Sequence, residues 1–256
     1  MAPVRPAADV LDAILPEIAG STGLDPATPV HCGIHDSNAS LLPHLTRRKQ
    51  PFSVVSTGTW VIAMAIGGDA VELDPARDTL VNVNAFGAPV PSARFMGGRE
   101  FEMLLSADPT PPSDDDVEAV LASGTLLMPA VQQGSGPFAS RQSAWIGGEP
   151  RGGQRTAAAS FYLALMTATA LGLIGARGPT IVEGPFASNP AFLKMLAAAT
   201  AGDVVAAGSA TGTSVGAALL AGGDSTGAAS AAAEAVITSP GAEWEAYADR
   251  WRRAVG

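Results

Sequence analysis

Apolar and polar positions follow two different periods along the chain, and together they predict a mixed α/β protein. Strand-like apolar runs occupy residues 29–34, 52–56, 60–66, 79–86, 179–184 and 203–207. Helical spacing of apolar residues occupies residues 6–23, 39–45, 155–176, 188–201, 213–221 and 242–255. The early strands follow one another through a tight turn, whereas the later strands alternate with helices. We therefore expect a mixed sheet with an antiparallel element, flanked by helices, and not a doubly wound parallel sheet.

An acidic triplet, Asp114-Asp115-Asp116, follows a proline-rich stretch and allows two interpretations. It suits the first turn of a helix, where carboxylates are favourable and can cap free backbone N–H groups. It would also supply oxygen ligands for a metal. Because three adjacent side chains do not converge on one point, the sequence favours the helix start. Residues 132–153 are rich in Gly and Pro and predict a long loop.

Composition excludes several classes of protein. The chain has 256 residues, of which 47% are hydrophobic and 15% charged, so it can bury a core and is not globally disordered. Its formal net charge of -9 argues against nucleic-acid binding. The most apolar stretch, residues 157–174, is interrupted by Ser and Thr and suits a buried helix, so no membrane span is expected. A single cysteine, Cys32, and no recognisable export signal predict a cytoplasmic protein.

Several familiar motifs fail on inspection. Residues 212–216 match the G-x-S-x-G nucleophile elbow, but all three histidines precede Ser214, opposite to the order in that hydrolase fold. Close helix packing at Gly216 and Ala217 is the simpler explanation. Neither lysine follows a glycine, so a Walker A loop is absent, and no G-x-G-x-x-G follows a strand. The His31, Cys32, His35 and Asp36 group resembles metal ligands, yet a strand sends neighbouring side chains to opposite faces, and we predict no metal site.

Two polar segments remain as candidates for chemistry. Asp36 follows a strand that ends at a glycine, where its carboxylate could act as a general base at the mouth of a cleft. The alternative is that Asp36 caps the next helix. Residues 56–59 (STGT) join two strands, and their hydroxyls and outward backbone N–H groups could hold a phosphate. Many ordinary hairpins have such turns, so both alternatives stay open on local grounds.

The order of three segments resembles a known family. Residues 30–38 (VHCGIHDSN), 54–60 (VVSTGTW) and 181–189 (IVEGPFASN) occur in that order and precede residues 212–221. This arrangement is similar to the C-terminal part of FGGY-family carbohydrate kinases, in the sugar kinase, Hsp70 and actin superfamily. The resemblance implies a ribonuclease H-like, actin-like ATPase lobe. Residues 1–50 would form a linker and catalytic-Asp segment and residues 51–256 the nucleotide-binding lobe, with the N-terminal sugar-binding lobe absent.

The resemblance also implies roles for individual residues. Asp36 would be the catalytic base that activates a sugar hydroxyl toward the γ-phosphate of ATP, with Mg²⁺ neutralising phosphate charge. The predicted nucleotide contacts are Thr57, Gly58 and Thr59 in the second phosphate loop, Gly184, Ser188 and Asn189 in the adenosine segment, and Gly212 and Thr213 at the turn into a packed helix. Expected partners are a sugar, a separate N-terminal lobe and a second copy of the chain.

Two departures from the family pattern keep other functions open. Pro185 stands where the family has a second glycine, which removes a backbone donor from the adenosine segment. Family members are about twice as long and begin with a first phosphate loop that does not precede residue 11 here. A non-catalytic nucleotide-binding relic and an unrelated α/β enzyme are therefore alternatives. The forms of residues 56–60 and 134–138 favour a fuculose- or rhamnulose-type substrate.

Overall fold

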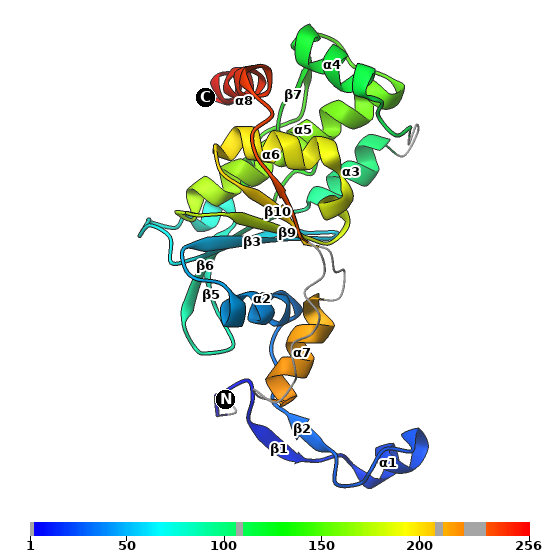
Figure 1. Cartoon of the computed structure of the whole chain (residues 1–256), viewed down its shortest axis with the longest axis vertical. Helices are drawn as coiled ribbons and strands as arrows, with labels where there is room; N and C mark the ends of the chain where they lie inside the picture. The colour runs from blue at the N-terminus through cyan, green and yellow to red at the C-terminus, as the bar shows by residue number, and fades with distance from the viewer. Residues whose placement is uncertain (1–2, 106–109, 208–211, 223–233) are drawn as a thin grey trace. The chain divides into compact units, whose positions relative to one another are not determined.

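The computed structural model describes residues 3–105, 110–207, 212–222 and 234–256 (Figure 1). The chain divides into two compact units. The first unit comprises Met1–Arg48, Val83–Pro89 and Thr211–Ala231, and the second comprises Lys49–Asn82, Val90–Ala210 and Ala232–Gly256. Each unit carries part of the predicted site.

A mixed sheet forms the centre of the second unit. Within the described ranges it has seven strands in the order β11 (Ala235–Ile237), β10 (Val204–Ala206), β9 (Thr180–Glu183), β3 (Phe52–Thr57), β4 (Val61–Ile66), β6 (Pro89–Phe95) and β5 (Thr79–Val83). β3, β9 and β10 are parallel, whereas β3–β4, β4–β6 and β10–β11 are antiparallel. The predicted mixed sheet with an antiparallel hairpin is confirmed.

Helices cover this sheet and complete the core (Figure 1). They are α3 (Gly97–Leu105), α4 (Asp114–Ser123), α5 (Gly152–Leu173), α6 (Pro190–Thr200) and α8 (Ala242–Val255), with short 3-10 helices η1 (Pro75–Arg77) and η2 (Pro185–Ser188) and a small pair of strands, β7 (Leu126–Leu127) and β8 (Trp145–Ile146). Phe161 of α5 packs edge-on against Trp244 and Tyr247 of α8, with ring centroids 5.0 and 5.1 Å apart.

The longest helix is a core element. α5 is long and apolar enough to cross a membrane by length and composition, but 78% of its apolar window is buried inside the structure. Its alanines let α6 and the sheet approach closely. The hydroxyls of Ser160, Thr167 and Thr169 donate to carbonyls of their own helix; for example, Thr167 Oγ1 donates to Leu163 O. The prediction of a buried helix at this position is confirmed.

The acidic triplet begins a helix, as the sequence favoured. Ser113 and Asp116 form a capping box at the start of α4, in which the Ser113 hydroxyl accepts from the Asp116 N–H and Asp116 Oδ2 accepts from the Ser113 N–H. These hydrogen bonds from Ser113 hold the pKa of the Asp116 carboxyl below its usual value. Among the described residues, no three His, Cys, Asp or Glu side chains gather as a metal site would require.

The first unit contains β1 (Val10–Ala13), α1 (Pro16–Thr22), β2 (Pro29–His31), α2 (Asp36–Arg47) and α7 (Gly212–Gly222). The helix predicted over residues 6–23 is wrong in its first half, because β1 pairs antiparallel with β2. Pro16 explains the break: it forces Leu15 into an extended conformation (ψ 139°) and itself fits only a first helical turn.

Candidate functional site

The predicted phosphate loop is the tight turn between β3 and β4, here called the β3–β4 turn (residues 57–60). Strand pairing ends at Thr57 opposite Val61, and the Gly58 N–H donates to Trp60 O at 2.9 Å to close the turn. Gly58 and Thr59 are exposed. The Thr59 hydroxyl makes no hydrogen bond within the described ranges. The turn therefore offers a free hydroxyl and an open backbone to a ligand.

Thr57 has a different role from its two neighbours. Its side chain is buried, and its hydroxyl donates to Glu183 O and accepts from the Phe186 N–H at 3.1 Å. Both bonds join the β3–β4 turn to the segment that follows β9. Thr57 thus fixes the turn in place, and its hydroxyl is already engaged inside the protein.

Replacing Thr57 with Val should lower the free energy of unfolding by about 2 kcal/mol, because Val keeps the shape but leaves a buried N–H and a buried carbonyl without this partner. Urea denaturation monitored by Trp fluorescence measures the change. Thr200→Val is the matched control, since the Thr200 hydroxyl bonds only to Leu196 O of its own helix. Equal stabilities of wild type and Thr57→Val would show that Thr57 does not hold the turn.

Gly184 lets the adenosine segment approach the β3–β4 turn. Its φ is +82°, and a Cβ at this position would collide with the carbonyl oxygen of Thr57. Pro185, the departure from the family pattern, is the first residue of η2. The N–H that proline lacks has no partner inside a helix at that position, so η2 forms without it, and the next N–H, of Phe186, bonds to Thr57.

The other two residues predicted in the adenosine segment differ in exposure. Asn189 caps α6, because its Oδ1 accepts from the Phe192 N–H at 3.1 Å and its Nδ2 donates to Ser160 Oγ at 2.9 Å. The helix predicted over residues 188–201 is confirmed, with Asn189 as its cap and Pro190 as its first residue. Ser188 is the last residue of η2 and is exposed.

Sequence reasoning missed a third segment at the β3–β4 turn, the start of α3. A Cβ at Gly98 would collide with the carbonyl oxygen of Gly58, and the Arg99 N–H donates to Thr59 O at 3.3 Å. The partial positive charge of a helix N-terminus therefore lies against the turn. The Gly97-Gly98 pair was the signal in the sequence, but nothing local connected it with Gly58, forty positions earlier.

In the first unit, Asp36 is the first residue of α2, and its side chain is 73% exposed. The interpretation of Asp36 as the helix cap is wrong: His35 occupies the cap position, and its Nδ1 accepts from the Ser37 N–H at 3.4 Å. Asp36 Oδ1 lies 2.8 Å from His35 Nδ1 and accepts from the Ser37 N–H at 2.6 Å. Asp36 Oδ2 makes no hydrogen bond in the part of the chain that the structure describes.

Gly212 and Thr213 begin α7 and lie close to Asp36 within the same unit. The Thr213 hydroxyl donates to Asp36 O at 3.5 Å. A Cβ at Gly216 would collide with the carbonyl oxygen of Ala39, so α7 and α2 pack backbone against backbone. The hydrolase-like motif is therefore a helix-packing motif, as predicted for Gly216, whereas Ala217 is exposed and takes no part.

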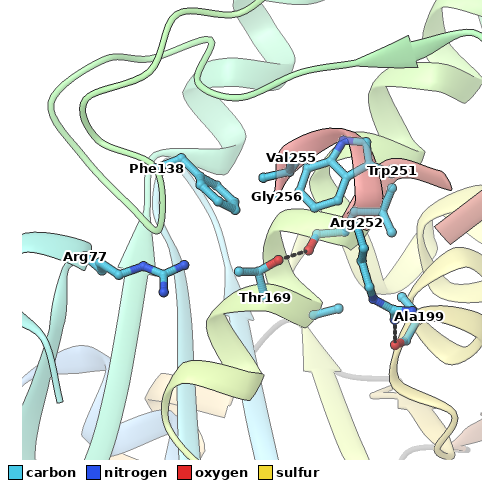
Figure 2. A pocket seen from close by; sticks show the side chains of 10 residues that line it. Arg77, Phe138, Thr169, Ala199, Trp251, Arg252, Val255 and Gly256 are labelled. Carbon is cyan, nitrogen blue, oxygen red and sulfur yellow. Dashed lines mark hydrogen bonds between the residues drawn. The ribbon is translucent and has the colours of Figure 1, made fainter. Parts of the chain in front are cut away.

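The second unit also contains a cavity of about 310 Å³. It is lined by residues of α5, α6 and α8 together with Arg77 of η1 and Phe138; Phe138 and Trp251 make a T-shaped ring contact, and Arg77 reaches toward Thr169 (Figure 2). None of the predicted site residues is among the ten that line it. The predicted chemistry thus lies on turns and helix starts and not in this cavity.

Comparisons with known proteins agree with this arrangement. Residues 49–231 match the family model "Carbohydrate kinase FGGY, C-terminal domain". The chain is similar over 100% of its length to 58% of a carbohydrate kinase from Novosphingobium aromaticivorans, with 38% identity and a TM-score of 0.84. It is also similar to a xylulose kinase from Rhodospirillum rubrum (20% identity, 98% of this chain, 54% of that one, TM-score 0.68).

A glycerol kinase from Plasmodium falciparum, whose structure was solved with ADP, shares the fold at 15% identity and a TM-score of 0.66, over 90% of this chain and 51% of that one. No curated protein matches the chain. The chain spans little more than half the length of each of these solved structures.

Proposed function

The chain belongs to the FGGY carbohydrate kinase family as a C-terminal lobe, and from this we propose that it takes part in ATP-dependent phosphorylation of a sugar hydroxyl. The observation that carries the proposal is the convergence at the β3–β4 turn. The start of α3 and the Gly184–Phe186 segment both pack against Thr57 and Gly58 through glycines at which a Cβ would collide with a backbone oxygen of the turn. The turn is thereby rigid while the Thr59 hydroxyl stays accessible.

The two units would divide the chemistry between them. In the second unit, Thr59, the turn backbone and the start of α3 would bind nucleotide phosphates, and Gly184 and Ser188 would border the adenosine. In the first unit, Asp36 would accept the proton of the sugar hydroxyl as that oxygen attacks the γ-phosphate. Phosphoryl transfer depends mainly on positioning and on neutralising charge, which suits preorganised turns.

The residues present fit a Mg²⁺–nucleotide. Mg²⁺ keeps several waters and is usually held through substrate phosphates with one or two carboxylates. We propose that it is carried on the phosphates, where it supplies the charge neutralisation that the transfer needs. The exposed, uncharged β3–β4 turn is suited to phosphate oxygens, because it offers hydrogen-bond donors and no carboxylate that would repel them.

The substrate that we propose is a ketose or deoxyketose of the fuculose or rhamnulose type. It rests on residues 56–60 and on the loop at residues 134–138, where the Gly136 N–H donates to Asp78 Oδ2 at 2.7 Å. Structural relatives include kinases of xylulose, gluconate and glycerol. A separate N-terminal lobe, a homodimer and a cytoplasmic location complete the proposal.

Two measurements test the proposed function. Calorimetry with Mg-ADP asks whether the chain binds a nucleotide. A coupled assay asks whether it phosphorylates fuculose, rhamnulose, xylulose or glycerol, alone and together with the N-terminal half of the Novosphingobium kinase. Binding and sugar-dependent ADP release are the expected results. Binding without turnover in either format would indicate a non-catalytic nucleotide-binding protein, and absence of both would contradict the proposal.

Thr59→Ala should weaken nucleotide binding about 10- to 100-fold, the equivalent of one hydrogen bond to a charged phosphate, with little change in stability because the hydroxyl is exposed. Calorimetric titration with Mg-ADP measures the affinity. Thr22→Ala is a suitable control, since Thr22 is an exposed threonine of the first unit whose hydroxyl bonds to its own helix. An unchanged affinity for ADP would remove Thr59 from the phosphate site.

A further inference from the structure

A buried carboxyl lies one residue beyond the contact between α3 and the β3–β4 turn. Glu100, in the first turn of α3, is 1% exposed. Its Oε1 accepts from the Gln132 N–H at 2.9 Å, whereas its Oε2 has no hydrogen-bond partner among the described residues. Burial raises the pKa of the Glu100 carboxyl to about 7. A glutamate at this buried position is unexpected, because burying an apolar side chain there would cost less free energy.

Tyr162 of α5 is the titratable group that faces Glu100 from the neighbouring helix. Its hydroxyl accepts from the Val131 N–H at 3.4 Å. Burial and the nearby Glu100 charge raise the pKa of the Tyr162 phenol well above its usual value, so it stays protonated. Two successive backbone N–H groups, of residues 131 and 132, are therefore held by two side chains that lie on α5 and α3.

The hydrogen bond between Glu100 and Gln132 lies next to the contact between α3 and the β3–β4 turn. Gly98 and Arg99, immediately before Glu100, are the residues of α3 that touch Gly58 and Thr59. The first turn of a helix is where backbone N–H groups lack partners inside the helix and where fraying begins. A hydrogen bond that holds Glu100 to the loop at residue 132 thus restrains the end of α3 that supports the turn.

We propose that Glu100 is a positioning residue for the nucleotide phosphates, acting through the start of α3 on the β3–β4 turn. This rests on the proposed function of that turn. What matters for positioning is the hydrogen bond that the carboxyl oxygen accepts from Gln132. A glutamine keeps that acceptor, whereas a leucine removes it and leaves the Gln132 N–H without this partner.

Calorimetry with Mg-ADP at pH 6 tests the proposal on four proteins. Wild type should bind. Glu100→Leu should bind about 3- to 10-fold more weakly, and Glu100→Gln should restore affinity to within about 2-fold of wild type. Tyr247→Phe is the control for instability alone: it removes a buried hydrogen bond to Thr125 O elsewhere in the second unit, so it should unfold more easily yet bind ADP as wild type does.

A pH comparison of stability tests the buried state of Glu100 separately from its effect on nucleotide binding. The folded protein holds a proton on Glu100 that the unfolded chain releases near pH 4.5, so stability falls as pH rises from about 4.5 to about 7. Glu100→Gln lacks this loss. It should therefore melt at a higher temperature than wild type at pH 8 and at a similar temperature near pH 5.

The outcomes separate this proposal from the one on which it rests. If wild type does not bind ADP, the proposed function of the turn is wrong. If wild type binds and Glu100→Leu binds equally well, Glu100 does not position the turn. Should Glu100→Leu fail to fold, Tyr162→Phe decides: loss of the acceptor for the Val131 N–H should weaken ADP binding in the same direction, and an unchanged affinity would overturn the proposal.

Discussion

Asp36→Asn is expected to lower kcat of the two-lobed kinase by about 10²- to 10⁴-fold while leaving nucleotide affinity nearly unchanged. The amide keeps the size of the carboxylate and an oxygen that can accept from the Ser37 N–H, so the start of α2 should persist. It cannot accept a proton from a sugar hydroxyl. The loss should therefore fall on the chemical step and not on the binding of ATP.

Steady-state kinetics with saturating sugar and varied ATP separate these effects, in an enzyme completed where necessary with the N-terminal half of the Novosphingobium kinase. Asp25→Asn is the matched control, because Asp25 is another exposed aspartate of the first unit whose Oδ1 accepts a backbone N–H, that of Ala27. It should keep full activity. Weak ATP binding with normal turnover in Asp36→Asn would reverse the roles proposed for the two units, and full activity would remove Asp36 from the chemistry.

The accessibility of Asp36 agrees with the role of a base. The carboxylate is largely exposed, one of its oxygens is held by the Ser37 N–H, and the other makes no hydrogen bond within the described ranges. A base must reach its substrate, and an oxygen without an internal partner is available for that contact. A cap, by contrast, would be engaged with the helix, and here that position belongs to His35.

Local patterns predicted much of the sheet because strand periodicity and turn residues are local properties. The two runs around residues 57–60, the later alternation of strands with helices, and the closing helix all appear where predicted. The prediction of one helix over residues 6–23 failed because Pro16 marks the start of a helix and not its middle. The apolar residues before Pro16 belong to strand β1. β6 was missed because Pro89 and Pro91 make it look like a loop.

The candidate site was less predictable, because its geometry depends on contacts between distant residues. Nothing near Thr57 in the sequence shows that its hydroxyl is engaged by residues 183 and 186. Nothing near Asn189 shows that its side chain is used both as a cap and by Ser160. The family resemblance predicts which segments form the site, and the structure separates the residues that build the turn from those that are exposed.

Gly98→Ala should have a large effect for a single methyl group, because it falls where the start of α3 meets the β3–β4 turn. Its Cβ would collide with the Gly58 carbonyl oxygen, so either the turn or the start of α3 must move. We expect a loss of about 2–4 kcal/mol in the free energy of unfolding. We also expect ADP affinity to fall by about 10-fold or more, because a shift of the order of an ångström in a positioning contact is costly. Urea denaturation and calorimetry with Mg-ADP measure the two effects.

Gly172→Ala is the control that separates the effect of the steric collision at Gly98 from the general effect of replacing a helical glycine with alanine. Gly172 also lies in a helix of the second unit, but nothing lies within 4 Å of the place where its Cβ would be. Alanine there should be neutral or stabilising by up to about 1 kcal/mol, since it is the better helix former. If Gly98→Ala destabilises the protein yet binds ADP as tightly as wild type, the start of α3 supports the fold alone. If both measures fall together, the helix start and the turn act as one phosphate-binding unit.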